Sequence, residues 1–141
     1  MIALVVATEA PIYEDVMVER IARAHGFQRS GNNIYQIIAR VIGREFTRAK
    51  DDDRVVIWPI GMQTNTLSPY RESFRGMRSH SDIPLAELAS LAAPFARLRM
   101  NDEEVLRWMV EHFQLGRLRE ATRGRFEAAL KLGRNTARLS P

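Results

Sequence analysis

The sequence predicts an α+β fold that is mainly α. Two observations carry this prediction. In residues 1–60, apolar residues recur at helical spacing in two segments, and a run rich in β-branched residues then follows an acidic turn. In residues 83–141, helical spacing recurs in three further segments. The chain has 141 residues, of which 45% are hydrophobic, so it can bury one core or two very small ones.

The chain opens with an apolar run over residues 2–7, which Pro11 separates from a short extended segment. Residues 14–25 predict a helix, because acidic residues fill its first turn and apolar residues recur on one stripe. That stripe consists of Met17, Ile21 and Ala24. Gly26 is expected to end this helix as its C′ residue, with Phe27 as the apolar residue that often accompanies such a cap.

The next helix is predicted over residues 30–45, with Ser30 as its N-cap. Four apolar residues at i, i+3, i+4 and i+7 form its predicted buried stripe: Ile34, Ile37, Ile38 and Val41. Residues 45–50 and 54–58 flank three aspartates, residues 51–53, and predict a β-hairpin with an acidic tip. The predicted order is helix, short strand, helix, turn, helix, hairpin, which is that of a winged helix-turn-helix.

The second half predicts a helical, helix-turn-helix-like block. A short helix over residues 84–93 is expected to end at Pro94. Asn101 is expected to cap another helix, with Glu104 completing a capping box. The apolar stripe of that helix consists of Leu106, Met109, Val110 and Phe113. A last helix is expected from about residue 119 to residue 131. Its buried residues are Phe126, Ala129 and Leu130, and the residue that ends it is Gly133.

The predicted domain organisation has three parts. Residues 1–60 form the winged helix-turn-helix, residues 61–82 form a linker or surface strap without clear periodicity, and residues 83–141 form a helical block packed on the first. Residues 14–29 and 103–117 share an acidic start, an apolar stripe and a glycine-containing turn. This likeness is explained either by an internal duplication or by two helix-turn-helix units that obey the same local rules.

Composition excludes several classes of protein. The sequence contains no cysteine, so disulfides and thiolate metal sites are excluded. Its first apolar run is too short for a signal-peptide core, and no window approaches the roughly 18 apolar residues that a membrane span needs. We therefore expect a cytoplasmic protein without membrane contact.

No catalytic motif is recognisable, and we expect no catalysis, no metal and no cofactor. The sequence lacks a phosphate-binding P-loop motif. Its three histidines lie far apart and have no ligand-type neighbour at helical spacing: His25, His80 and His112. The three aspartates at the hairpin tip are explained by a solvated turn. Ser79, His80 and Asp82 are neighbours on a loop, where side chains rarely converge on one substrate atom.

Charge is unevenly distributed along the chain. Residues 1–60 carry eight basic and eight acidic residues, yet residues 28–50 carry five basic residues against one acid. Residues 114–138 carry seven basic residues against two acids. Such basic stretches either contact a polyanion or form ordinary solvated helix faces.

The face of the predicted helix 30–45 opposite its apolar stripe carries side chains suited to DNA. Asparagine and glutamine can pair with adenine edges, arginine with guanine, and arginine and lysine with phosphates. The predicted DNA-contacting residues, including two on the hairpin, are Arg29, Ser30, Asn32, Asn33, Gln36, Arg40, Arg44, Arg48 and Lys50. Ala39 and Gly43 would let this helix approach a groove closely. A protein-interaction face and an ordinary helix surface are the alternatives.

The aromatic residues have two expected roles. Trp58 and Trp108 are expected to anchor the core. Tyr70 lies among three arginines of the strap, and we expect it to be exposed and able to stack on a single strand. Those arginines are Arg71, Arg75 and Arg78.

Four short motifs make the chain resemble a known family. They are an acidic-Pro-Ile motif at residues 9–12, a Gly-aromatic-x-Arg-Ser-Gly turn at 26–31, an Ile-Trp-Pro strand end at 57–59 and an Ile-Pro helix start at 83–84. The family is a winged-helix-like domain of unknown function at the C-terminus of large bacterial and archaeal superfamily-one helicase-like proteins. It often lies beside a restriction-endonuclease-like domain.

The resemblance implies that the chain is a fragment of such a protein and that it positions DNA for an attached helicase or nuclease. Docking of the motor onto a partner, or onto its own other domains, is the alternative role. The family often repeats its Arg-[Ser/Thr]-Gly turn in the second half. Here that position reads Gly116-Arg117-Leu118-Arg119, which leaves open whether the second half also binds DNA.

Overall fold

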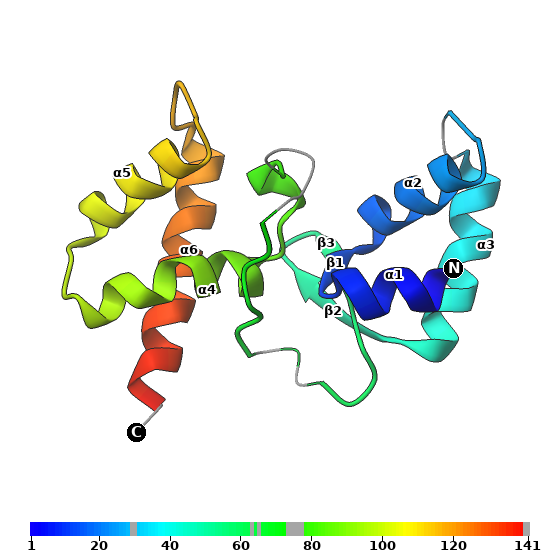
Figure 1. The fold of residues 1–141 in the computed structure, drawn as a ribbon, viewed down its shortest axis with the longest axis horizontal. Helices are drawn as coiled ribbons and strands as arrows, with labels where there is room; N and C mark the ends of the chain where they lie inside the picture. The colour runs from blue at the N-terminus through cyan, green and yellow to red at the C-terminus, as the bar shows by residue number, and fades with distance from the viewer. Residues whose placement is uncertain (29–30, 63, 65, 73–77, 140–141) are drawn as a thin grey trace. The chain divides into compact units, whose positions relative to one another are not determined.

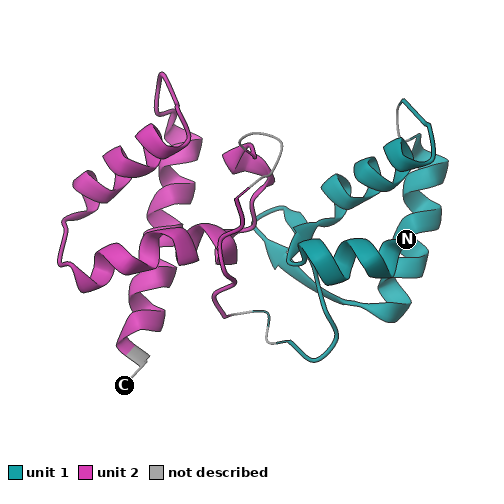
Figure 2. Cartoon of the chain, in the orientation of Figure 1, with its two compact units in different colours: residues 1–64 teal, residues 65–141 magenta. Residues whose placement is uncertain are grey.

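The α+β, mainly helical fold is confirmed by a computed structural model, which describes residues 1–28, 31–62, 64, 66–72 and 78–139 (Figure 1). Two compact units make up the chain, residues 1–64 and residues 65–141 (Figure 2). The predicted packing of the second block on the first stays a prediction.

Unit 1 follows the predicted order of elements. Its elements are α1 (Ile2–Glu9), β1 (Ile12–Tyr13), α2 (Glu14–Ala24), α3 (Asn32–Glu45), β2 (Thr47–Asp51) and β3 (Arg54–Trp58). The strands form an antiparallel sheet in the order β1-β3-β2, with Ile57 of β3 between Ile12 and Arg48. The predicted hairpin is confirmed, and its turn places Asp52 at a positive φ of 54°, a conformation that aspartate tolerates better than most residues.

The end of α2 forms as the sequence predicts. Gly26 has a φ of 83°, and its N–H donates to the Arg23 carbonyl at 3.0 Å. The Phe27 N–H donates to the Ala22 carbonyl at 3.0 Å, which completes a Schellman motif. The predicted stripe of α2 is wrong at one position, because Ala24 is exposed. The buried residues of the helix include Met17, Val18, Ile21 and Ala22.

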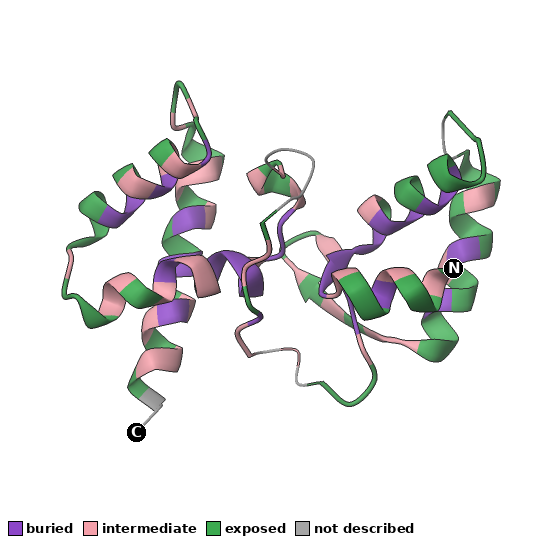
Figure 3. Ribbon diagram, viewed as in Figure 1, coloured by how far each residue is buried: buried purple, intermediate pink, exposed green. Residues whose placement is uncertain are grey.

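The predicted stripe of α3 is wrong for two of its four residues. Ile38 and Ile42 are buried, whereas Ile37 is 63% exposed and Val41 is 40% exposed. At about 100° per residue, Ile37 and Ile42 lie about 140° apart around the helix. The apolar arc of α3 is therefore wider than the arc that the core covers, and Figure 3 shows exposed residues predominating along α3.

The first turn of α3 also differs from the prediction. The N-cap is Gly31, and no side chain caps the helix by a hydrogen bond. Ser30, which we predicted as the cap, lies outside the described residues.

Among its described residues, unit 2 has three α-helices around one apolar cluster. These helices are α4 (Leu85–Arg97), α5 (Asp102–His112) and α6 (Glu120–Leu139), and a short 3₁₀ helix, η1 (His80–Asp82), precedes them. The fully buried residues include Leu88, Leu106, Met109 and Phe126. The capping box at α5 is confirmed: Glu104 N–H donates to Asn101 Oδ1 at 2.9 Å, and Asn101 N–H donates to Glu104 Oε2 at 3.0 Å.

Two predicted helix ends in unit 2 are wrong. Helix α4 continues through Pro94 to Arg97, and the ring of Phe95 packs 4.6 Å from that of Trp108. Pro94 has no backbone N–H, so the helix loses the hydrogen bond to the carbonyl four residues earlier. The contact of Phe95 with Trp108 stabilises the helical turn beyond the proline and offsets this loss.

Helix α6 continues through Gly133 to Leu139. A Cβ on Gly133 would lie 3.0 Å from the Ala89 carbonyl oxygen and 3.4 Å from the Ala93 Cα. The glycine therefore serves close approach of α6 to α4 rather than termination of the helix.

The segment before α4 packs on unit 2. Ser68 is buried, and its N–H donates to the Ala86 carbonyl at 3.2 Å. Leu67 and Tyr70 pack against the apolar cluster. Part of the predicted linker thus belongs to the packed structure of unit 2.

Candidate nucleic-acid interface

The described residues that we predicted on α3 share one exposed face. Each side chain of this set is exposed: Asn32, Asn33, Gln36, Arg40 and Arg44. The helical period places them within an arc of about 120° on the side away from Ile38. Arg29 and Ser30 lie outside the described residues.

The two basic residues of the hairpin have different surroundings. Arg48 and Lys50 are exposed and, being two positions apart on β2, point to the same side of the sheet. Arg48 donates to the Ala39 carbonyl at 2.6 Å and places its Nε 2.9 Å from Glu14 Oε2. Within the part of the chain that the structure describes, Lys50 forms no ion pair. The charge of Arg48 is thus compensated within unit 1, whereas no described carboxylate compensates the charge of Lys50.

Gly43 and Ala39 make room for Arg48. A Cβ on Gly43 would lie 2.9 Å from an Arg48 guanidinium nitrogen. We predicted that these two small residues would let α3 approach a DNA groove. Gly43 leaves room for the guanidinium and the Ala39 carbonyl accepts its hydrogen bond, so Arg48 ties the hairpin to α3; approach to a DNA groove stays a prediction.

Sequence reasoning missed Glu14, which lies at the floor of this region. It is the first residue of α2 and is buried, and it accepts a hydrogen bond from the Tyr35 hydroxyl at 2.8 Å. Partial burial, followed by the hydrogen bond to Glu14, raises the pKa of Tyr35. No described donor makes a hydrogen bond to Glu14 Oε2, so Arg48 compensates that oxygen through charge alone.

These residues surround an open polar hollow of about 590 Å³ between α3 and the hairpin. Its lining residues are Glu14, Tyr35, Gln36, Ala39, Arg40, Gly43 and Arg48. The mixture of donors, one carboxylate and two guanidinium groups suits hydrogen bonding rather than covalent chemistry.

The hairpin tip carries negative charge. Asp51 accepts a hydrogen bond from the Tyr13 hydroxyl at 2.7 Å. Arg54 lies 3.6 Å above the Tyr13 ring and pairs with Asp15 at 2.8 Å. These contacts fix the hairpin on α2 and leave Asp52 and Asp53 exposed at its end. The negative charge of this tip would repel a phosphate backbone.

The expectation of an exposed stacking aromatic in the strap is wrong. Tyr70 is half-buried, its hydroxyl lies 3.1 Å from His112 Nε2, and its ring packs edge-on against His112 and Phe113. Arg71 and Arg78 both bind the buried Glu87. The third arginine, Arg75, lies outside the described residues.

The two tryptophans that we predicted as core anchors differ in burial. Trp58 is buried at the end of β3. Trp108 is half-buried and stacks on His112, with ring centroids 5.0 Å apart.

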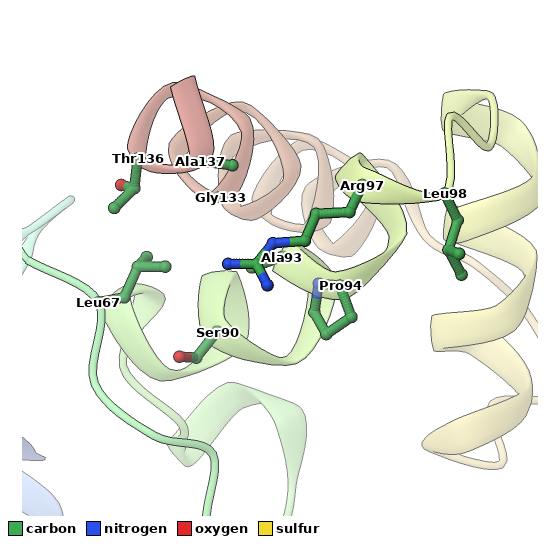
Figure 4. A pocket seen from close by; sticks show the side chains of 9 residues that line it. All are labelled: Leu67, Ser90, Ala93, Pro94, Arg97, Leu98, Gly133, Thr136 and Ala137. Atoms are coloured by element: carbon green, nitrogen blue, oxygen red, sulfur yellow. The ribbon is translucent and has the colours of Figure 1, made fainter. Parts of the chain in front are cut away.

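Unit 2 contains an apolar pocket of about 420 Å³ between α4 and the last turns of α6 (Figure 4). Its lining residues are Leu67, Ser90, Ala93, Pro94, Arg97, Leu98, Gly133, Thr136 and Ala137. Figure 4 shows Arg97 extending across the pocket toward Ala93. The Thr136 hydroxyl donates to the Leu132 carbonyl at 2.9 Å, so it is not presented as a nucleophile.

Polar residues of η1 and the residue before it contact one another or aromatic rings. Ser79 Oγ lies 2.7 Å from Ser81 Oγ, and the His80 ring packs against Phe113 and Phe126. Burial, and then the charge of Arg125, lower the pKa of His80. Among the described residues, no three His, Asp or Glu side chains gather as a metal would require. Nor does any described helix combine the length and apolar character needed to cross a membrane.

The comparison with known proteins is limited to the start of the chain. A family model described as a protein of unknown function, DUF3320, matches residues 1–36, which include α1, β1, α2 and the first turn of α3. No curated protein and no solved structure matches the chain.

Proposed function

We propose that the chain is a DNA-binding accessory domain in which unit 1 contacts duplex or junction DNA through α3. The observation that carries this proposal is the exposed face of α3 with Gln36, Arg40 and Arg44. Neither arginine forms an ion pair with any residue that the structure describes. Their charges are therefore available to phosphates, and the amides of Asn32, Asn33 and Gln36 are available to base edges.

The charges of unit 1 predict a weak, salt-sensitive complex. Arg40, Arg44 and Lys50 supply three uncompensated cations, whereas Arg48 is paired with Glu14. Three neutralised phosphates correspond to a slope of about −3 in a plot of log affinity against log salt concentration. Sequence preference then depends on the amide side chains of α3.

The proposal includes attachment of this domain to a larger helicase-like protein. The chain resembles a domain that accompanies helicase-like proteins, and an accessory DNA contact of modest strength suits attachment to a motor or nuclease. The proposal assigns no catalysis to this chain.

Fluorescence polarisation with labelled duplex, junction and single-stranded DNA at several salt concentrations tests the proposal. Arg40→Gln and Arg44→Gln should each weaken all duplexes and make the salt slope shallower by about one unit. Arg107→Gln on α5 removes the same charge from an exposed position of unit 2 and is the control.

Gln36→Ala tests base reading separately. This change removes no charge, so non-specific affinity should be kept, while any preferred duplex should lose about 1–3 kcal/mol. A flat salt response, or equal losses for the α3 and α5 variants, would exclude α3 as the DNA contact.

A further inference from the structure

A second surface of α3 is apolar and lies beside the predicted DNA face. A groove of about 480 Å³ runs between the first turn of α1, the end of α2 and α3. Most of its apolar lining comes from Ile21, Phe27, Ile34, Ile37, Ile38 and Val41. Every lining residue belongs to unit 1, so the groove is defined within that unit.

The groove leaves large apolar side chains in contact with water. Ile37 is 63% exposed, Phe27 is 52% exposed and Val41 is 40% exposed. Single exposed apolar residues are common on protein surfaces, but several that line one concave surface mark an interaction site. The exposure of Ile37 and Val41 is also what made the predicted stripe of α3 too wide.

The border of the groove along α3 is positively charged. Arg40 and Arg44 follow Ile37 by three and seven positions, which places them about 60° and 20° from it around the helix. Both are exposed, and in the described part of the chain neither has a carboxylate partner. Glu45 is the acidic residue of the lining and lies within the apolar arc, about 20° from Ile38 and about 100° from Arg44 around the helix.

We propose that this groove binds an amphipathic helix of a partner protein, with acidic residues beside its apolar stripe. The apolar stripe would cover Ile37 and Val41, and the acidic residues would face Arg40 and Arg44. The groove is built from helices and presents no strand edge, which favours a helix over an added strand. A second copy of the chain would bring the same arginine border, with Glu45 as the one carboxylate of its groove lining, whereas a partner helix can present several acidic residues to Arg40 and Arg44.

This inference does not rest on DNA binding, but the two surfaces share Arg40 and Arg44. A helix seated in the groove would engage the same guanidinium groups that the DNA proposal assigns to phosphates. The partner and DNA should therefore compete for unit 1.

A displayed library of short helical peptides, selected on the full chain, provides the test. The library varies both the apolar stripe and the charge of the flanking positions. Enriched peptides should carry apolar residues at i, i+3 or i+4 and i+7, with aspartate or glutamate beside them. Fluorescence polarisation of an enriched peptide then gives its affinity.

Variants locate the binding site. Ile37→Ser and Val41→Ser should each weaken the peptide by about tenfold or more, and Arg44→Glu should weaken it by at least about fivefold. Leu98→Ser changes an apolar residue of unit 2 that is 68% exposed and should leave affinity unchanged. Circular dichroism melts establish that each variant is folded.

Three results would overturn the proposal. The first is enrichment of basic peptides or of none. The second is binding that survives both Ile37→Ser and Val41→Ser. The third is self-association of the chain, seen by sedimentation and abolished by Ile37→Ser, which would assign the groove to a second copy.

Discussion

Each unit contains a buried glutamate that ties a non-helical segment to a helix. In unit 1, Glu14 binds Tyr35 and Arg48, which joins α2 to α3 and to the hairpin. In unit 2, the fully buried Glu87 of α4 binds Arg71 and Arg78 from the preceding segment. The Arg71 backbone N–H also donates to Glu87 at 2.9 Å.

The two carboxylates differ in how they face water. Glu87 is enclosed by its partners, and Arg78 makes two contacts to it at 2.5 and 3.1 Å. Glu14 lies at the floor of an open hollow, and Arg48 is itself exposed. A buried glutamate paired with arginine is therefore shielded from water in unit 2, whereas in unit 1 it lies beneath an accessible polar surface.

Apolar exposure follows the same division. Among the described residues, the large apolar side chains that are exposed belong to unit 1, with Leu98 as the exception. A unit that buries its large apolar residues has less apolar surface left for a partner. Unit 1 is thus the better candidate for recognition.

The largest expected effect comes from the buried carboxylates. Glu87→Gln leaves two arginines without a counter-charge in a buried site and should lower the free energy of unfolding of unit 2 by about 4 kcal/mol. Glu14→Gln keeps an acceptor for Tyr35 and leaves an exposed arginine, so its expected loss is about 1 kcal/mol. Native-state hydrogen exchange measures α4 and α2 separately.

Glu103→Gln is the control for both carboxylates, because Glu103 is exposed and pairs with Arg123 on the surface. Its expected effect is within about 0.5 kcal/mol. Equal losses of unfolding free energy for Glu87→Gln and Glu14→Gln would contradict the view that Glu87 is shielded from water and Glu14 is accessible to it.

The register of α3 gives the next largest effect. Ile42 is fully buried, so Ile42→Ala should destabilise unit 1 by about 3 kcal/mol. Ile37→Ala removes similar atoms from the groove surface and should change stability by no more than about 0.5 kcal/mol. Urea unfolding in a Trp108→Phe background uses the buried Trp58 as a reporter of unit 1. If Ile37→Ala lowered the free energy of unfolding as much as Ile42→Ala, Ile37 would be buried and the predicted stripe of α3 would be correct at that position.

The sequence predicted the elements of the fold because their signals are local. The capping box of Asn101 and Glu104 and the left-handed Gly26 act within a few residues, and both form as predicted. The errors at Pro94 and Gly133 have a tertiary origin. Phe95 packs on Trp108, and Gly133 lies against α4, so contacts distant in sequence override the local signal to stop a helix.

The candidate site was predictable only where helical periodicity sufficed. Period alone placed Gln36, Arg40 and Arg44 on one exposed face of α3. The role of Glu14 was not readable, because its partner Tyr35 lies 21 positions away and no short motif links them. The strap arginines were misjudged for the same reason, since Glu87 lies 16 positions beyond Arg71.

Two glycines of α6 provide a matched test of the close contact in unit 2. Gly133→Ala places a methyl group against the Ala89 carbonyl oxygen, and the expected loss is about 1 kcal/mol after the gain in helix propensity. Gly124→Ala meets no atom within 4 Å and should stabilise α6 by about 0.5–1 kcal/mol. Thermal melts of the two variants should shift in opposite directions. Shifts of the same sign would show that α4 and α6 do not approach as closely as described.

The smallest expected effect is a pH dependence confined to unit 2. Burial, and then Arg125, lower the pKa of His80, while Asp82 acts weakly in the opposite direction. The folded state therefore favours the neutral ring, which packs on Phe113 and Phe126. As pH falls through the ordinary histidine value of about 6.5, the unfolded chain takes up the proton first.

The stabilisation by His80 is accordingly complete above that pH and is lost progressively below it, until the folded pKa is reached. Urea unfolding followed by circular dichroism between about pH 5 and 8 should show this loss. His80→Phe keeps an aromatic ring in the cluster and removes the titration, so the slope in this window should decrease. If the variant keeps the full slope, the pH dependence belongs to other groups and the half-buried ring of His80 does not contribute to it.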